Sequence, residues 1–192
     1  MRKVTVIILL LVYLFTPAVF LSSNSMTQLN RSMPFKLPEQ DINPVDVNVN
    51  EMFGASFELI GMVRSVVETH QVPASIVYAL IQKESTWYPR AKSPKNANGS
   101  RDYGLMQLSS SNFELFTWKY KPRYCYTTMD VYDNVDAGVQ YLRDQYKQFG
   151  SWEAALAAYN CGPGRYKTGK IPESTKIYVR DVLQMAKTLR GE

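Results

Sequence analysis

The stretch Ala79–Ser85 reads Ala-Leu-Ile-Gln-Lys-Glu-Ser and places a carboxylate on the apolar face of a predicted helix. Leu80 and Ile81 precede Glu84 by four and three residues, so the three side chains share one face. Pro89 follows closely, which predicts that the helix ends just after Glu84. Desolvation and the negative end of the helix dipole both disfavour the charged carboxylate, so they predict a raised pKa suited to a general acid. The helix alone also allows a plainer interpretation, in which Glu84 is a partly buried residue paired with an Arg or a backbone N–H.

The composition of the 192-residue chain is that of a folded domain with additional segments. Hydrophobic residues make up 45% and charged residues 20%, which is ordinary for a folded soluble protein. The net charge is +5, of which Arg2 and Lys3 supply two. This mild excess suits an anionic polymer or surface as partner. No cluster of Lys and Arg interleaved with aromatics is present, so nucleic acid is not a predicted partner.

The first 25 residues have the pattern of an export segment. Met-Arg-Lys precedes the apolar run Val4–Leu21, and the small polar stretch Ser22–Ser25 follows. The segment is either a signal peptide removed after Ser25 or a retained membrane anchor, because the run is about long enough to cross a bilayer. Residues 26–52 are polar and contain three prolines, which predicts a linker. We expect membrane contact only through the N-terminal segment.

Residues 53–192 form the predicted domain, which is mainly α. Apolar residues recur there at three- and four-residue spacing, whereas strand signals are almost absent. Asn134, Ser151 and Pro172 are predicted to open three of the later helices, and Gly150 to close the first of these. The apolar spacing predicts helices over residues 57–69, 73–84, 134–149, 152–160 and 172–189, with a further helical stretch at 104–108 capped by Asp102.

The chain has two cysteines, Cys125 and Cys161, and a single histidine, His70. In an exported protein the two cysteines either form a disulfide or remain free thiols. One His without a Cys/His cluster predicts no metal site. It also excludes a Ser-His-Asp or Cys-His centre built on any other His. No cofactor is predicted.

Three separated motifs carry a resemblance to a known family. They are Glu84-Ser85, then Gly-Leu-Met-Gln at 104–107, then Ala-Tyr-Asn-Cys-Gly at 158–162. In this order they resemble the lytic transglycosylase catalytic domain of the soluble lytic transglycosylase (SLT) type, over roughly residues 56–185. The resemblance implies a lysozyme-like helical fold of the goose-type-lysozyme kind. Asn98–Gln107 resembles the smaller branch associated with secretion, pilus and conjugation machines, which implies such a machine as a partner.

The resemblance also implies a reaction and its residues. The substrate would be peptidoglycan glycan strands, cleaved between N-acetylmuramic acid and N-acetylglucosamine without water, which leaves 1,6-anhydro ends. Glu84 would be the sole group that first donates and then accepts a proton. Cys161 stands where the family commonly has Ala, and it is a candidate disulfide partner of Cys125. Substrate contacts are implied for a set of residues in the matching segments: Ser93, Gly104, Met106, Gln107, Tyr159 and Tyr178.

Two other functions stay open on the sequence alone. A lysozyme-like hydrolase would use Glu84 with a water positioned by Asp102, although Asp102 also suits a helix cap. A catalytically inactive peptidoglycan-binding or assembly protein is the second alternative. The intact motif around Glu84 argues against it.

Overall fold

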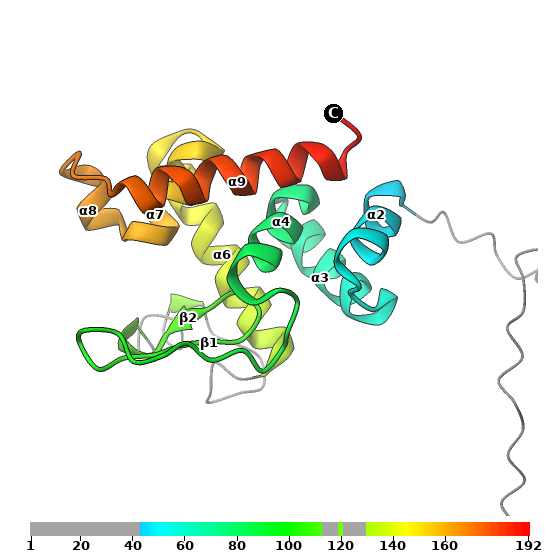
Figure 1. Ribbon diagram of the computed structural model, residues 1–192, viewed down its shortest axis with the longest axis horizontal. Helices are drawn as coiled ribbons and strands as arrows, with labels where there is room; N and C mark the ends of the chain where they lie inside the picture. Colours follow the sequence, from blue (N-terminus) through cyan, green and yellow to red (C-terminus); the bar gives the residue numbers. More distant parts are fainter. Residues whose placement is uncertain (1–42, 113–118, 121–129) are drawn as a thin grey trace, which may run out of the picture. The chain divides into compact units, whose positions relative to one another are not determined.

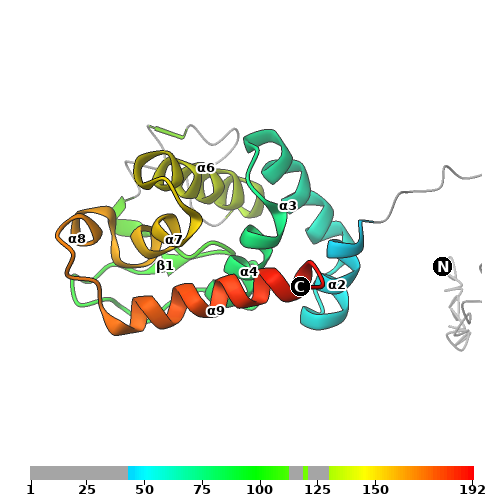
Figure 2. The ribbon, with the colours of Figure 1, turned by 90° about the horizontal axis from the view of Figure 1, so that it is seen from above.

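The computed structural model describes residues 43–112, 119–120 and 130–192, which all belong to one unit of the chain, Ile42–Glu192. The described part is mainly helical, as the apolar spacing predicts (Figures 1 and 2). None of its helices is long and apolar enough to cross a membrane. Its elements are α2 (Pro44–Phe53), α3 (Phe57–His70), α4 (Ala74–Ser85), β1 (Asp102–Tyr103), β2 (Leu108–Ser109), the 3₁₀ turn η1 (Ser110–Asn112), α6 (Val131–Phe149), α7 (Trp152–Cys161), α8 (Pro163–Lys167) and α9 (Glu173–Leu189).

Helix α4 lies at the centre of the hydrophobic core. All six residues of Ile76–Ile81 are buried, because α2, α3 and α9 pack against different faces of this helix. Figure 2 shows the length of α9 running beside α4. Lys83 and Asp181 join the two helices at the surface, with 2.9 Å between Nζ and Oδ2. A helix that is apolar on nearly all sides is typical of a core position, so α4 is a rigid support for the residues at its end.

Helix α2 corrects the predicted linker, because residues 44–52 belong to this helix rather than to a connecting segment. Asn43 caps it by accepting a hydrogen bond from the N–H of Val45, and Val49 is fully buried. Asp46 is also buried, where it forms an ion pair with Arg64 and accepts a hydrogen bond from the Tyr78 hydroxyl. The sequence does not predict this helix because polar residues such as Asp46 suggest an exposed segment. The partners that allow Asp46 to be buried belong to α3 and α4.

Helices α6 and α7 form an antiparallel pair joined at Gly150, whose φ of 81° lies in the left-handed region. Ser151 caps α7 as predicted, by accepting a hydrogen bond from the N–H of Ala154. The predicted cap of α6 is wrong, because Asp130 occupies that position and accepts a hydrogen bond from the N–H of Asp133. Asn134 instead lies inside α6, where its side chain is buried.

The segment 102–109 is a β-hairpin and not the helix predicted over residues 104–108. Strands β1 and β2 pair antiparallel, and residues 104–107 turn between them. Asn134 holds this turn, because its Oδ1 accepts a hydrogen bond from the N–H of Met106 and its Nδ2 donates one to the carbonyl of Tyr103. Gly104 has a φ of +74°, and a Cβ there would lie 2.5 Å from Cγ of Asn134. Both the backbone and the space at Gly104 therefore require glycine.

Candidate active site

Glu84 is the penultimate residue of α4, where the sequence places it. The chain leaves the helix through two consecutive left-handed residues, Thr86 with a φ of 50° and Trp87 with a φ of 60°. Trp87 is buried, and its ring lies 5.7 Å from the ring of Tyr78. The Ser85 hydroxyl donates to the carbonyl of Ile81 in the preceding turn. These contacts fix the end of α4 and therefore the position of Glu84.

The surroundings of Glu84 favour the protonated carboxyl. Burial is the main cause that raises its pKa from 4.5 to about 7, and the negative charge of Asp102 acts in the same direction. The hydroxyl of Tyr178 donates a hydrogen bond to Oε1 of Glu84 at 2.5 Å, which opposes the rise. Lys83 also opposes it, more weakly. Glu84 therefore changes its protonation state near neutral pH, as a group that both gives and takes a proton must do.

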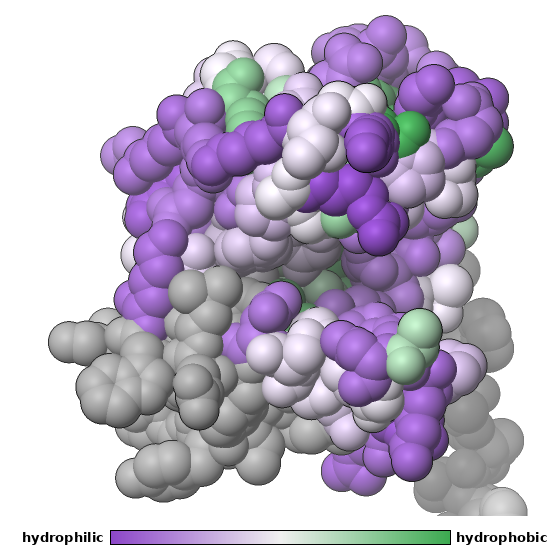
Figure 3. All heavy atoms as spheres, turned by 90° about the vertical axis from the view of Figure 1, so that its left-hand side faces the viewer, coloured by the Kyte–Doolittle hydropathy of each residue, from purple (hydrophilic) through white to green (hydrophobic). Residues whose placement is uncertain are grey.

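Glu84 opens into a cleft of about 780 Å³. The end of α4, the hairpin, α6 and the turn from α7 into α8 all contribute to its lining. Figure 3 views the domain from this end and shows a hollow between an upper and a lower part, with mostly hydrophilic residues along the upper rim. The described lining residues are Glu84, Asn96, Ala97, Asn98, Ser100, Asp102, Gln107, Leu108, Ser109, Asn112, Tyr141, Tyr159, Asn160, Cys161, Gly162, Pro163 and Arg165.

Tyr159 and Gln107, two of the predicted substrate contacts, line this cleft. The Tyr159 hydroxyl donates to the carbonyl of Met106 at 2.7 Å, so it ties α7 to the hairpin turn. Burial and the charge of Glu84 hold the pKa of this hydroxyl well above its usual range. The Gln107 side chain donates from Nε2 to the carbonyl of Gly104 and so closes the same turn. Both side chains brace the hairpin while they border the cleft.

Four other predicted contacts lie outside the lining of the cleft. Met106 is fully buried, and its side chain lies against Gly138 of α6, so it is a core residue. Gly104 makes its close backbone approach to Asn134 and not to the cleft. The buried Tyr178 acts on Glu84 through its hydrogen bond.

Ser93, the fourth, holds a loop in place. Its hydroxyl donates to the carbonyl of Pro94 and accepts from the N–H of Asp102, each at 2.8 Å. The bond from Asp102, together with the one that the N–H of Ser93 donates to the carbonyl of Asp102 at 3.0 Å, attaches the loop before the hairpin to strand β1. Its position is that of a turn-stabilising hydroxyl.

Asp102 lies in β1 rather than at a helix cap, and it faces the same cleft as Glu84. The Asn96 side chain donates to both of its carboxylate oxygens, at 3.2 and 3.3 Å. On the other side of the cleft, Asn160 accepts a hydrogen bond from the Thr175 hydroxyl at 2.8 Å and so connects α7 with α9. Polar contacts therefore hold both sides of the cleft, one between the loop before the hairpin and β1, the other between α7 and α9.

Cys161 borders the cleft as a partly exposed free thiol. The structure therefore does not contain the candidate disulfide at this position, and Cys125 lies outside the described residues. Within the described ranges, no group of three or more His, Cys, Asp and Glu side chains is placed to hold a metal ion.

Several lining residues were not found from the sequence. Tyr141 comes from the middle of α6, and its ring lies 5.4 Å from the ring of Tyr159. Arg165 comes from α8, a helix that the sequence does not predict because Gly162 and Pro163 indicate only an ending. The polar residues Asn96, Asn98 and Ser100 of the loop before the hairpin, and Asn112 of η1, also belong to this group. In the sequence these residues lie in polar stretches without periodicity, so no pattern indicates which of them face a cleft.

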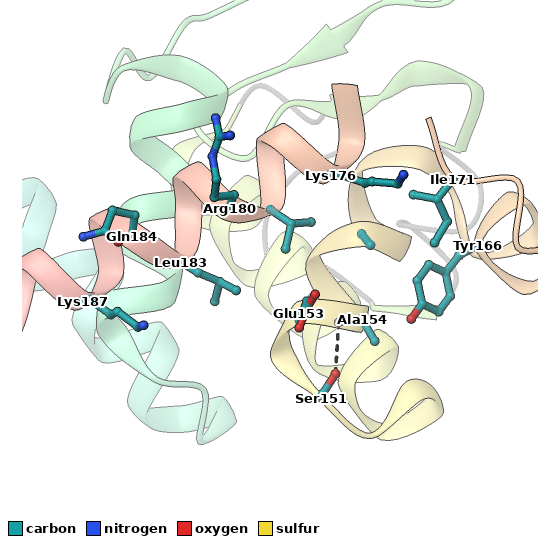
Figure 4. A pocket seen from close by; sticks show the side chains of 12 residues that line it. Ser151, Glu153, Ala154, Tyr166, Ile171, Lys176, Arg180, Leu183, Gln184 and Lys187 are labelled. Atoms are coloured by element: carbon teal, nitrogen blue, oxygen red, sulfur yellow. Dashed lines mark hydrogen bonds between the residues drawn. The ribbon is translucent and has the colours of Figure 1, made fainter. Parts of the chain in front are cut away.

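A separate groove of about 670 Å³ lies between α7 and α9 (Figure 4). Leu183, Ile171 and Tyr166 supply part of its apolar lining, while Lys176 and Arg180 lie along α9. Neither Glu84 nor any other residue of the Glu84 cleft lines this groove. We therefore assign the candidate active site to the Glu84 cleft.

Comparison with known proteins agrees with this fold. Residues 62–178 match the family model described as the transglycosylase SLT domain. The chain is 34% identical over 105 residues to the soluble lytic murein transglycosylase of Escherichia coli K12. The matched region is 51% of this chain and 15% of that protein. It is 31% identical over 121 residues to the invasion protein IagB of Salmonella typhimurium SL1344. This matched region is 62% of this chain and 71% of that protein.

Two solved structures show the same fold. The 70-kDa soluble lytic transglycosylase SLT70 of E. coli has a TM-score of 0.61 and 28% identity, over 74% of this chain and 25% of that one. An inactive variant of the lytic transglycosylase Slt from Pseudomonas aeruginosa has a TM-score of 0.60 over 87% of this chain and 27% of that one. At 18% identity, the second shows the fold alone.

The chain belongs to the transglycosylase SLT domain family. The predicted lysozyme-like helical class is confirmed. The chain matches only about a seventh of the length of the E. coli enzyme, so the relationship concerns one domain of that larger protein.

Proposed function

We propose that this protein is a peptidoglycan lytic transglycosylase. It cleaves the β-1,4 bond between N-acetylmuramic acid and N-acetylglucosamine without water and leaves 1,6-anhydro-N-acetylmuramic acid ends. The observation that carries the proposal is Glu84, whose pKa is raised by burial to about 7 in a cleft large enough for several sugar rings. Membership of the SLT family supports the choice of glycan and of reaction.

In the first step the protonated Glu84 gives its proton to the glycosidic oxygen, and the bond from that oxygen to C1 breaks. Positive charge develops at C1, where the substrate's own N-acetyl group shields it. In the second step the Glu84 carboxylate takes the proton of the C6 hydroxyl while O6 forms a bond to C1. Glu84 ends the cycle protonated. A pKa near the working pH suits both steps, because neither protonation state is then strongly disfavoured.

The Tyr178 hydroxyl supports the carboxylate stage of this cycle. A hydrogen bond donated to Oε1 stabilises the charged form, so it limits the effect of burial on Glu84. Without such a donor the carboxyl would be a weaker acid and would release its proton less readily. We infer that Tyr178 is a positioning residue that acts through Glu84.

The test is digestion of purified sacculi in ¹⁸O-labelled water, followed by mass analysis of the released muropeptides. Transglycosylation predicts anhydro ends, which are lighter than reducing ends by one water and carry no ¹⁸O at C1. Reducing ends that contain ¹⁸O would replace the proposal with hydrolysis.

One observation favours hydrolysis as a second candidate. Asp102 faces the cleft with Glu84, and Asn96 holds both of its oxygens, so a water between the two carboxylates would have an acceptor. Asp102→Asn distinguishes the two. Hydrolysis requires the carboxylate, so the variant would lose reducing-end products, whereas anhydro products would continue if Asp102 affects only the pKa of Glu84.

We further propose that the protein is exported and works in the periplasm or cell envelope, with residues 1–25 as signal peptide or inner-membrane anchor. The resemblance of Asn98–Gln107 to the smaller branch supports service to a secretion, pilus or conjugation machine. One relative carries the name invasion protein. Fractionation of cells that express the full chain tests the first point: recovery in the cytoplasm would contradict export.

A further inference from the structure

Arg165 is the single cation among the described residues that line the Glu84 cleft. The other charged groups of this lining are the carboxyls of Glu84 and Asp102. Arg165 lies on α8, at the same end of the domain as the hairpin (Figures 1 and 2). The guanidinium of Arg165 is thus the one group of this lining that carries a positive charge for an anionic ligand.

The backbone at Arg165 is fixed in place. Helix α8 begins at Pro163, directly after Gly162, whose φ of 85° lies in the left-handed half of the backbone map. The carbonyl of Arg165 accepts hydrogen bonds from both the N–H and the hydroxyl of Thr168. The rings of Tyr166 and Phe149 pack edge to face with their centroids 4.7 Å apart, which attaches α8 to the end of α6. The side chain of Arg165 thus starts from a rigid point beside the cleft.

The guanidinium of Arg165 is exposed and has no hydrogen bond or ion pair with any described residue. Some other arginines of the domain do have such partners. Arg180 pairs with Asp181, Arg190 with Glu192, and Arg101 donates to the carbonyl of Ser93. Arg165 therefore keeps its five N–H donors available for a ligand in the cleft.

We propose that Arg165 binds a carboxylate carried by the muramyl substituent of the glycan strand. The inference rests on the proposed function and adds a basis for substrate specificity. The sugar rings of the strand are neutral, so the lactyl group and its stem peptide carry its carboxylates. A guanidinium forms two parallel hydrogen bonds with a carboxylate, which fixes orientation as well as charge. The contact would also offset the repulsion that Glu84 and Asp102 exert on an anionic strand.

Two groups of the strand can supply this carboxylate, and substrates that carry only one of them distinguish the two. In strands that keep their peptides, the lactyl group is amide-linked and the carboxylates belong to the stem peptide. In strands stripped of peptides by an amidase, the lactyl carboxylate is free. A neutral N-acetylglucosamine oligomer carries neither and is the reference ligand.

The experiment measures binding of these three glycans to protein that carries Glu84→Gln, so that no cleavage occurs. Adding Arg165→Gln is expected to weaken binding of one or both carboxylate-bearing strands about tenfold and to leave the neutral oligomer unchanged. Arg165→Lys should recover part of the loss, because it keeps the charge without the fork. Lys167→Gln is the matched control, since it removes a cation from the same helix outside the cleft lining.

The outcomes are distinct. A loss on peptide-bearing strands alone assigns the contact to the stem peptide, and a loss on stripped strands alone assigns it to the lactyl group. Equal binding of all three glycans by Arg165→Gln and its parent would overturn the inference, while anhydro products from the wild type would leave the proposed function intact. If the parent bound no glycan, the proposed function would fall and the inference with it.

Discussion

The two sides of the cleft are built by different physical means. On the helical side, α4 and α9 hold Glu84 and Tyr178 by close apolar packing, which makes the Glu84 carboxyl a poorly hydrated group with a raised pKa. On the hairpin side, a network of side-chain and backbone hydrogen bonds holds a polar loop, and the carboxylate of Asp102 there accepts from the side-chain amide of Asn96. Burial thus sets the pKa of Glu84, and hydrogen bonding shapes the surface that would meet the glycan under the proposed function.

Substitution of Glu84 is expected to have the largest effect, because it removes the reacting group of the helical side and leaves the hairpin side unchanged. Glu84→Gln keeps the shape of the side chain but removes its proton transfer, and general acid–base catalysis is typically worth 10²–10⁴-fold. Because one group serves both steps, we expect a loss of about 10³-fold or more in the release of muropeptides from sacculi. Glycan binding should persist, since the hairpin side is unchanged. Cleavage at an undiminished rate would remove Glu84 from the mechanism.

The control for Glu84→Gln is its free energy of unfolding, which should exceed that of the wild type at alkaline pH. The pKa of Glu84 in the folded protein, about 7, lies above its ordinary value of 4.5. The stability contributed by the protonated group is therefore complete below about pH 4.5 and is lost as the pH rises through 7. Glu84→Gln escapes this loss, so denaturant unfolding should show it more stable than wild type by up to about 3 kcal/mol at pH 8 and little changed at pH 4.

Gly104→Ala tests the hairpin side. The new Cβ would lie 2.5 Å from Asn134, and the residue would have to keep a φ of +74°. Strain and overpacking predict a loss of about 2–4 kcal/mol in the free energy of unfolding. Gly99→Ala is the matched control: its φ is +80°, but no atom lies within 4 Å of the added Cβ. Equal destabilisation by both variants would mean that contact with Asn134 is not what requires glycine at 104.

Tyr178→Phe tests the polar exception within the helical side. The Tyr178 hydroxyl favours the charged form of Glu84, so its removal raises the pKa of Glu84 further. A hydrogen bond to a charged group predicts a rise of about one unit. The fall of kcat/KM at alkaline pH, which marks deprotonation of Glu84, should move upward by the same amount. A merely structural role would lower activity without moving this limb.

Ser93→Ala should have the smallest effect. It removes one bond that the hydroxyl donates to Pro94 and one that it accepts from Asp102, at a partly exposed position. We expect about 1 kcal/mol less stability by denaturant unfolding and a change of about twofold in kcat/KM. A far larger loss of activity at unchanged stability would show that Ser93 contacts substrate, as its motif implies.

The same contrast explains what sequence reasoning could find. The helical side is encoded locally: apolar spacing, Ser151, Gly150 and Pro172 predict helix positions that the structure confirms. The placement of Glu84 at the end of α4 follows from the same pattern. Periodicity succeeds for α6 and α9 because each exposes one side and buries the other, and the sequence around the buried helix α4 still marks where that helix ends.

The hairpin side depends on partners far away in the chain. Gly104–Gln107 looks helical because its apolar residues are close together, yet Asn134 of α6 holds it as a turn. Asp46 makes α2 look like a linker, although Arg64 and Tyr78 satisfy it in the core. Arg165 was missed because α8 has no periodicity to detect in five residues. These contacts become visible only when the segments are brought together.

The most direct test of this account is a ¹³C NMR titration of the Glu84 side-chain carboxyl in the resting protein. Assignment comes from the loss of one resonance in Glu84→Gln. The account predicts a midpoint near pH 7 for wild type and a higher one for Tyr178→Phe. A midpoint near the ordinary 4.5 would contradict it, because Glu84 would then be ionised at neutral pH and unable to begin the reaction as an acid.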